Sequence, residues 1–148
     1  MRYVLMHVSD LHAGRPFRPA LAEQVAREAH ELKPDLLVVS GDYVQRADFP
    51  HQWDVITRYL RTLPEPRLVV AGNHDVPLLN VYRRIFRPYD TYRSRISPDL
   101  NPVFERPGLA VVGGCSAHGL TMDGGYLSLE QRETMRRAFE RQPAGTCK

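Results

Sequence analysis

The chain has 148 residues, of which 43% are hydrophobic and 25% are charged, as in one ordinary globular domain and unlike a disordered or fibrous protein. Twenty Lys and Arg side chains against 17 Asp and Glu leave a net charge of +3, too mild a field for a dedicated nucleic-acid binder. Its two cysteines lie outside any C-x-x-C pair and exclude a disulfide framework, and no apolar run reaches the ~18 residues of a membrane span. Because a signal peptide is also missing from the N-terminus, we expect a cytoplasmic protein.

Three short apolar runs in the first half of the chain are predicted to be buried strands. They cover residues 3–8, 36–39 and 68–71. Between them, apolar side chains recur at helical spacing, which predicts two helices, the first over residues 20–32. The apolar stripes of these helices are Leu21, Val25, Ala29 and Leu32 in the first, and Trp53, Ile56, Leu60 and Leu63 in the second. This alternation is the βαβ order of a parallel sheet.

The next part of the chain predicts a helical segment and a β-hairpin. Residues 80–96 are rich in arginine and tyrosine and are expected to be helical, with a break at Pro88. Residues 103–106 and 109–112 read as two short strands, because Pro107-Gly108 lies between them as a turn.

The last part of the chain predicts a glycine-rich loop over residues 113–125 and a final helix. Ser128, with Gln131 three residues later, forms a capping box that opens this helix, which runs to about Arg141. Its buried face is expected to contain Leu129, Met135 and Phe139. No further strand is expected after it.

A short polar motif follows each of the three predicted parallel strands. These motifs are Asp10-x-His12, Gly41-Asp42 and Gly72-Asn73-His74-Asp75, at near-equal spacing. The carboxyl ends of parallel strands share one edge of a sheet, so these side chains are expected to meet in space. Each motif alone is also typical of an ordinary polar turn. Three of them in this order, each after a buried strand, indicate one site.

The residue types in these motifs indicate a metal site. Carboxylates together with imidazole suit Mn²⁺, Fe or Zn²⁺, whereas oxygen ligands alone would favour Mg²⁺ or Ca²⁺. Asp42, on the central strand, can bridge two ions, and Asn73 adds a neutral amide oxygen. Two ions ~3.5–4 Å apart can activate a water and stabilise the attacking and leaving oxygens of a phosphoryl displacement. His74 beside Asp75 resembles an imidazole suited to protonating a leaving alkoxide.

The three motifs resemble those of the calcineurin-like metallophosphoesterases. The matching stretches are HVSDLHAGRPF (residues 7–17), LLVVSGDYVQRAD (residues 36–48) and VVAGNHDVPLLN (residues 69–80). Two further stretches, RRIFRPYDTYRSRI (residues 83–96) and PVFE (residues 102–105), resemble the class III 3′,5′-cyclic-nucleotide phosphodiesterases. The resemblance implies an α/β fold, with this chain as the N-terminal half of a four-layer αββα sandwich.

The same resemblance implies a dinuclear centre with two divalent ions, Mn²⁺, Fe or Zn²⁺. Asp10 and His12 would bind the first ion, Asp42 would bridge, and Asn73 would bind the second. His74 would be the acid that contacts the phosphate, and Asp75 would orient it. The implied activity is hydrolysis of a phosphodiester, most closely of a 3′,5′-cyclic nucleotide such as cAMP, by a water activated at the metal pair. A nuclease and a nucleotide-lipid pyrophosphohydrolase are the alternatives, although no apolar lid for a lipid is evident in the sequence.

The sequence departs from the family in its later ligands. Family members carry three more histidine ligands, two of them in a Gly-His-x-His motif that this sequence lacks. Of the remaining histidines, His30 and His51 are expected on the surface and His7 at the edge of the core, while His118 in the glycine-rich loop favours a plain loop role over metal or phosphate contact. Residues 1–148 are therefore expected to be a single, incomplete domain of marginal stability, with a truncated non-catalytic fragment as the alternative.

The expected partner is a small phosphorylated substrate, in particular a nucleotide, together with a second copy or a complementing C-terminal half. Neither membrane contact nor stable nucleic-acid binding is expected. The arginines at positions 83, 84, 87, 93 and 95 favour a solvated helix face, and the alternative is a grip on a nucleotide, with Tyr82, Tyr89 or Tyr92 stacking on its base. Arg46 is a further candidate for phosphate contact, and Trp53 is expected in the core.

Overall fold

The three predicted apolar runs form one parallel sheet in the computed structural model, which describes residues 2–15, 17–120 and 124–148. The strands β1 (Leu5–Ser9), β2 (Leu36–Ser40) and β3 (Arg67–Val70) lie in that order, with β2 in the centre. Ser40, the last residue of β2, pairs with Ser9 on one side and with Val70 on the other. The three strands therefore end in line, and the turns that follow them leave the sheet at one edge.

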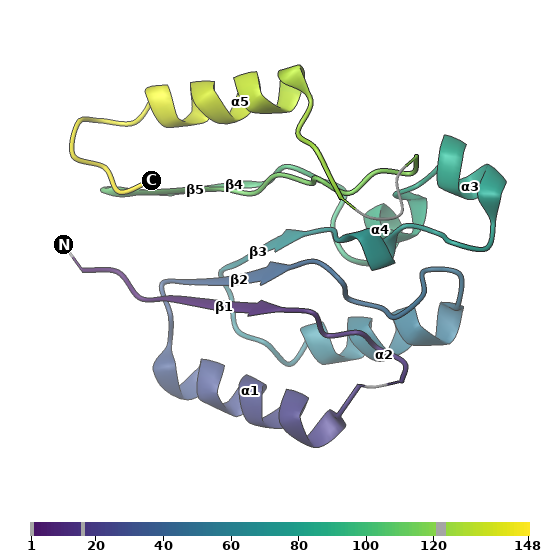
Figure 1. Cartoon of the computed structure of the whole chain (residues 1–148). Coiled ribbons are helices and arrows are strands. Elements are labelled where there is room, and N and C mark those ends of the chain that lie inside the picture. Colours follow the sequence, from purple (N-terminus) through teal and green to yellow (C-terminus); the bar gives the residue numbers. More distant parts are fainter. Residues whose placement is uncertain (1, 16, 121–123) are drawn as a thin grey trace.

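Two helices, α1 (Pro19–Leu32) and α2 (Pro50–Leu60), cover one face of this sheet (Figure 1). The predicted stripe of α2 is confirmed, because Trp53, Ile56 and Leu60 are buried, as is Leu63 just beyond the helix. Trp53 also donates its Nε1–H to the carbonyl of Ala47 at 2.9 Å, which completes the polar part of a core tryptophan.

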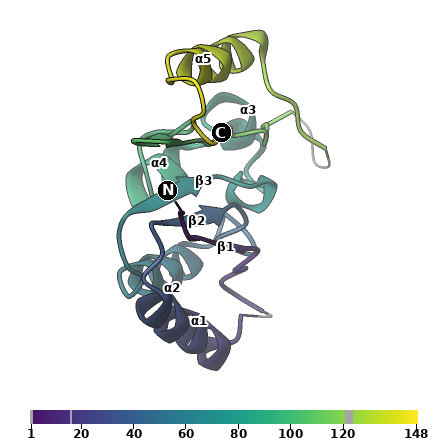
Figure 2. The same ribbon diagram turned by 90° about the vertical axis from the view of Figure 1, so that its left-hand side faces the viewer.

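The predicted stripe of α1 is partly wrong. Its buried residues are Ala22, Ala26 and Ala29, whereas Leu21 and Leu32 are about half exposed. The helix lies beneath β1, the edge strand, as Figures 1 and 2 both show. Small side chains allow a close approach to that strand, and the leucines overhang the sheet edge where no further strand among the described residues covers them.

The hairpin and the last helix form two further layers on the other face of the parallel sheet (Figure 1). β4 (Val103–Arg106) and β5 (Leu109–Val112) pair antiparallel as predicted, and α5 (Leu129–Glu140) lies outside them. The order of layers is therefore helices, parallel sheet, hairpin, helix. This is the αββα order expected from the resemblance, with a second sheet of two strands in the described part of the chain.

The capping box of α5 is confirmed in both directions, since Gln131 N–H donates to Ser128 Oγ at 3.1 Å and Ser128 N–H donates to Gln131 Oε1 at 2.9 Å. The expected burial of Leu129 is wrong: it is 77% exposed, and Ala138 is the buried residue of the helix. The segment after α5 also returns to the hairpin, where Cys147 forms a single parallel bridge with Leu109 that we did not expect.

The arginine-rich segment forms two short helices, α3 (Val81–Phe86) and α4 (Asp90–Arg95), separated around Pro88 as predicted. Tyr92 is fully buried against Tyr43, with their ring centroids 5.9 Å apart. The suggestion that Tyr92 stacks on a nucleotide base is therefore wrong, because a side chain in the core cannot reach a ligand. Across the described residues, no helix is both long and apolar enough to cross a membrane.

Candidate metal centre

The turns that carry the three polar motifs lie side by side at the carboxyl edge of β1–β3. The backbone N–H of His12 donates to the carbonyl of Asp42 at 2.8 Å, and that of Gly41 donates to Val70 at 2.7 Å. Two glycines allow this contact. Gly41 has a φ of +72° and faces Gly72, and a Cβ on Gly72 would come within 2.2 Å of Asp42 Oδ1. Larger residues at these two positions would push the turns apart.

Three of the predicted metal ligands have a left-handed backbone. Asp10, His12 and Asp42 have φ values of 58°, 45° and 52°. The other non-glycine residue with positive φ in the described part of the chain is Lys33, which ends α1. Such conformations cost about 1–3 kcal/mol each and gather at functional sites, where surrounding structure holds them. The strained positions therefore coincide with the motifs that the sequence singled out.

The side chains of His12, Asp42 and His74 converge. Each offers a ligand atom, and these atoms all lie within 4.8 Å of one another. His12 Nε2 is 3.7 Å from Asp42 Oδ2 and 3.6 Å from Asp10 Oδ1. These separations are longer than a hydrogen bond. They fit two ligand atoms that would bind the same metal ion, each at ~2.0–2.2 Å from it.

The chemistry of the donor atoms tests the fit of a metal ion. The donors are a mixture of imidazole and carboxylate, the set that suits Mn²⁺, Fe or Zn²⁺. The residues therefore fit a divalent ion. Asp10 lies at the rim of the cluster, with its side chain 64% exposed.

His74 is held by the turn that follows β2. Its backbone N–H donates to Asp42 Oδ1 at 3.0 Å, and its Nδ1 lies 2.9 Å from the carbonyl of Gln45. A carbonyl only accepts hydrogen bonds, so Nδ1 carries a proton and Nε2 has the lone pair of the neutral ring. Arg46 Nη1 donates to the same carbonyl at 2.8 Å and lies 3.2 Å from Nδ1. The role of the Gln45 carbonyl could not be predicted from the sequence, because every residue has a backbone carbonyl.

The expected contact between Asp75 and His74 is wrong. Asp75 lies in a 3₁₀ turn, η1 (Asn73–Asp75), and its fully buried carboxylate turns away from the cluster. Oδ1 accepts the N–H groups of Tyr43 at 2.9 Å and Val44 at 3.2 Å, and Oδ2 accepts that of Gly72 at 2.8 Å. Burial, and to a smaller extent the charge of Asp42, raises the pKa of Asp75 to about 7, against the three amides that favour its charged form. Asp75 thus ties the turn after β2 to the turn after β3.

Asn73 is exposed between two hollows. The first is lined by Gln45, Arg46, Asn73, His74, Val76, Leu78 and Arg84, and the second by Gly72, Asn73, Ser116, Ala117, Gly124 and Gly125. The glycine-rich loop therefore borders the site. His118 itself has a plain loop role, because its ring stacks on Tyr126 at 3.8 Å and its Nε2 lies 2.7 Å from the Tyr126 carbonyl.

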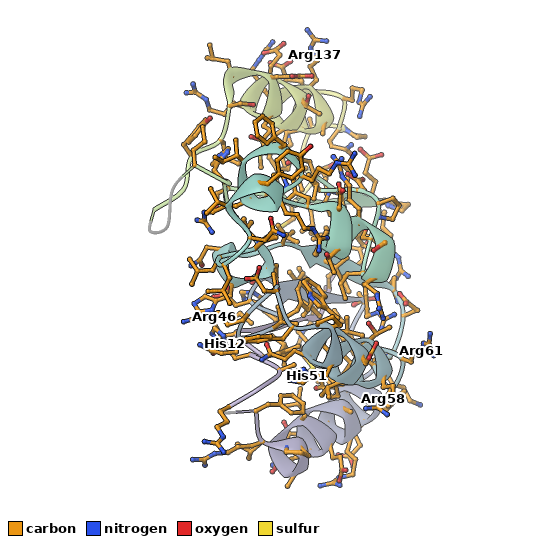
Figure 3. The ribbon with its side chains drawn as sticks, turned by 90° about the vertical axis from the view of Figure 1, so that its right-hand side faces the viewer. His12, Arg46, His51, Arg58, Arg61 and Arg137 are labelled. Atoms are coloured by element: carbon orange, nitrogen blue, oxygen red, sulfur yellow. The ribbon has the colours of Figure 1, made fainter. Side chains whose placement is uncertain are left out.

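Arg46 and His12 lie on the same side of the molecule in Figure 3, where Arg46 is labelled above His12. The Arg46 side chain is half-buried, and no carboxylate of the described residues lies within 4.0 Å of its guanidinium. A partly buried cation without a carboxylate partner is typical of an anion-binding position.

Asp48 is a residue that sequence reasoning missed. Its carboxylate accepts the backbone N–H groups of Leu78, Leu79 and Asn80 at 2.7 to 3.1 Å. Burial by itself would raise the pKa of Asp48, but these amides favour the charged form more strongly and lower it. Asp48 thereby fixes the segment that leaves the site toward α3. The sequence offered one indication of this role, an acidic residue six positions after Asp42.

The remaining histidines stand apart from the site. His30 and His51 are exposed, as predicted, and His30 Nε2 lies 2.8 Å from the Thr62 carbonyl. His7 is exposed on the edge strand, with Nε2 2.5 Å from Ser40 Oγ.

Comparison with known proteins places this geometry in context. Residues 3–145 match the family model described as calcineurin-like phosphoesterase. The UDP-2,3-diacylglucosamine pyrophosphatase LpxG of Chlamydia muridarum is 32% identical over 73 residues, which are 48% of this chain and 22% of that protein. The symmetrical bis(5′-nucleosyl)-tetraphosphatase of Serratia proteamaculans is 36% identical over 91 residues, 62% of this chain and 29% of that protein. The chain thus spans about a quarter of the length of these relatives.

A solved structure shows the same fold at low sequence identity. A purple acid phosphatase from yellow lupin (Lupinus luteus) seeds superposes with a TM-score of 0.63 at 12% identity, covering 95% of this chain and 28% of that one. The four layers described above therefore correspond to part of a larger fold.

Proposed function

The chain belongs to the calcineurin-like phosphoesterase family, whose members are metal-dependent phosphoesterases, and from this premise we propose that its site hydrolyses a phosphodiester, most closely a 3′,5′-cyclic nucleotide. The observation that carries the proposal is the convergence of His12, Asp42 and His74 at the carboxyl edge of the parallel sheet. The strained backbone at two of them and at Asp10 adds to it, because strain of this kind is retained where function needs it.

The ligand assignment follows the motifs. Asp10 and His12 would hold a first divalent ion, Asp42 would be shared with a second, and Asn73 would contribute its amide oxygen to the second. Two such ions, Mn²⁺, Fe or Zn²⁺, would supply positive charge that attracts a phosphate and offsets the charge that develops during its hydrolysis. Asp75 keeps the two ligand-bearing turns together through the backbone amides that it accepts.

His74 is the residue proposed to handle the proton of the leaving group. The Gln45 carbonyl fixes Nδ1–H, so the ring exchanges a proton with the substrate through Nε2. In its protonated form the imidazole donates from Nε2 to the leaving oxygen, which departs as an alcohol. Arg46, beside the same ring, is positioned to hold phosphate oxygens, and its guanidinium can do so with two parallel hydrogen bonds.

A second candidate function is hydrolysis of a phosphate anhydride in a nucleotide-linked substrate. Two arginines, Arg46 and Arg84, line the hollow beside His74, and two cations there suit two adjacent phosphate groups. The names of the two relatives describe a pyrophosphatase and a tetraphosphatase, which supports this alternative. Comparing release of AMP from cAMP with cleavage of a bis(5′-nucleosyl) tetraphosphate under the same metal conditions separates the two.

We also propose that residues outside 1–148 complete the centre. Asp42 and Asn73 alone supply two ligands to the second ion, fewer than the four or more that such ions take, and the chain spans about a quarter of its relatives. Titration with Mn²⁺ should therefore show one weak equivalent bound to the 148-residue chain. Two tight equivalents would contradict this part of the proposal.

The activity test uses the longest product of the gene with Mn²⁺ and bis(p-nitrophenyl) phosphate. Hydrolysis is measured as the release of p-nitrophenolate. Asp42→Asn should lower the rate at least about a hundredfold, because the bridging carboxylate is lost. Asp54→Asn on the outer side of α2, which pairs with Arg95 at 2.7 Å, is the matched control and should leave the rate unchanged. Full activity of Asp42→Asn would refute the ligand assignment, and no hydrolysis by the unsubstituted protein would refute the enzyme proposal.

A further inference from the structure

The short helix α3 directs its apolar side to solvent and its cationic side to the protein. Val81, Tyr82 and Phe86 are 62 to 67% exposed, and Ile85 is 44% exposed. The neighbouring Arg83 and Arg84 are half-buried: Arg83 donates to Thr91 Oγ1 and Arg84 to the Pro77 carbonyl, both at 2.8 Å. A surface helix of a globular protein ordinarily has the opposite orientation.

Two neighbouring leucines extend this apolar face. Leu79, just before the helix, is 66% exposed, and Leu120 is 81% exposed. Leu120 follows Gly119, which packs so tightly on the end of α3 that a Cβ there would come within 1.9 Å of the Arg84 carbonyl oxygen. Apolar groups gathered in this way on a protein surface mark a site of interaction. The α3 surface consists of Leu79, Val81, Tyr82, Ile85, Phe86 and Leu120.

The α3 surface lies at the same edge of the molecule as the metal centre. Figure 1 shows α3 beyond the arrowheads of β1 and β2, at the end of the molecule where their carboxyl ends open. The lining of the hollow beside His74 includes Leu78, just before α3, and Arg84, within it. Whatever covers the α3 surface therefore lies next to the entrance of the site.

Two exposed arginines follow this apolar face along the chain. Residues 80–96 contain five arginines and a single aspartate, but Arg83, Arg84 and Arg95 donate to Thr91, to the Pro77 carbonyl and to Asp54. Arg87 and Arg93 are exposed, and the aspartate, Asp90, is 3.9 Å from Arg87. Aliphatic and aromatic side chains flanked by arginine are typical of elements that lie in the interface of an anionic membrane.

We propose that the α3 surface docks on an anionic lipid bilayer and brings the metal centre to the membrane surface. A second copy of the chain is the other occupant that the test below separates. A stable protein interface takes roughly 20–30 residues from each side, whereas side chains that insert into a bilayer act one by one and need no such area. The sequence had indicated no membrane contact because no segment can span a bilayer, but peripheral docking needs none.

The test is co-sedimentation of the 148-residue chain with vesicles of phosphatidylcholine alone or mixed with phosphatidylglycerol. We expect binding to the mixed vesicles that weakens as salt rises, because the arginines contribute through screened charge. The double variant Leu79→Ser with Phe86→Ser should bind about tenfold or more weakly, since two inserted apolar side chains are lost.

The matched control makes the same two chemical changes elsewhere. Leu129→Ser with Phe49→Ser alters exposed residues on α5 and before α2, and should bind like the unsubstituted chain. Circular dichroism of both variants verifies the fold. The proposal is overturned if the chain stays in the supernatant with phosphatidylglycerol vesicles or if both double variants bind equally. Light scattering gives a further outcome that overturns the proposal: a dimer that is lost in the Leu79→Ser with Phe86→Ser variant but kept in the control variant. The α3 surface would then bind a second copy of the chain.

Discussion

The parallel sheet with α1 and α2 and the hairpin with α5 are both sheet-and-helix layers, yet they are packed very differently. In the first, Leu36, Val39, Trp53 and Ile56 are fully buried. In the second, Ala138 is the buried residue of α5, and β4 is largely exposed. All the residues that form the candidate centre stand on the first pair of layers. A site whose geometry must be held within a fraction of an ångström needs the dense layer beneath it.

The largest expected difference between the two regions is in stability. Trp53→Ala removes the largest fully buried side chain and should lower the free energy of unfolding by about 3–5 kcal/mol, enough to unfold a marginal domain. Leu129→Ala on α5 should change it by less than about 0.5 kcal/mol. Urea unfolding followed by circular dichroism measures both. Equal effects would mean that the second layer contributes as much as the first. That the chain itself is only marginally stable stays a prediction, which the same curves test.

The second prediction concerns the contact between the ligand-bearing turns. Gly72→Ala places a Cβ 2.2 Å from Asp42 Oδ1 and 2.5 Å from its backbone N, so the turn after β2 must move. We expect a loss of about 1–3 kcal/mol in stability and weaker Mn²⁺ binding. Gly145→Ala, in the segment after α5, has open space around it but a φ of +83°, and should cost about 1 kcal/mol through strain alone without altering Mn²⁺ binding. If both variants bind Mn²⁺ equally, the close approach of the two turns is not needed for the site.

A third prediction tests how the first region anchors the segment before α3. Asp48→Asn weakens a carboxylate that accepts three backbone amides, and should cost about 1 kcal/mol near neutral pH. Because folding lowers the pKa of Asp48, its contribution is present above the ordinary value of about 4 and is lost as pH falls through the lower folded value. Unfolding curves of the two proteins should therefore converge as pH falls below the ordinary pKa of an aspartate. Amide exchange at residues 78–80 should be faster in the variant at pH 7, and unchanged protection there would contradict the anchoring role.

The smallest effect is expected on the exposed face of α5. Glu133 accepts hydrogen bonds from Arg136 and Arg137, and these hydrogen bonds, together with the two positive charges, lower its pKa to about 2. The Glu133 side chain is partly exposed on the surface of the helix, so water and salt screen the interaction. Glu133→Gln should leave the unfolding midpoint unchanged at 0.15 M salt. A clear loss of stability would show that α5 depends on this ion-pair network more than on its packing.

Much of the fold was predictable because the governing patterns are local. Apolar runs bounded by polar turns identified β1, β2 and β3, and a serine three residues before a glutamine identified the start of α5. The packing of α1 was not predictable in the same way. Periodicity marks a helix and its apolar side, but whether Leu21 or Ala22 faces the sheet depends on where the sheet ends, and that is settled by strand order.

The candidate site shows the same division. The sequence predicted that five residues would meet, because the carboxyl ends of parallel strands share one edge of a sheet. These residues are Asp10, His12, Asp42, Asn73 and His74. The role of Asp75 was wrong, since adjacency along the chain does not determine direction in a 3₁₀ turn, where its carboxylate meets the amides of Tyr43, Val44 and Gly72. The Gln45 carbonyl and the Asp48 anchor were missed, because each contacts a partner far away in the sequence: the Gln45 carbonyl contacts the His74 ring, and Asp48 contacts the backbone amides of residues 78–80.

The sequence by itself determined which residue types follow the three parallel strands: carboxylates, imidazoles and an amide, which suit a divalent ion. The tertiary structure alone decided orientation. It placed the Asp75 carboxylate between two turns, where it accepts hydrogen bonds from both, and it buried Tyr92. It also left the apolar side of α3 exposed to solvent beside the site. The physical reason is that ligand identity is a property of single side chains, whereas direction and exposure depend on everything that packs around them.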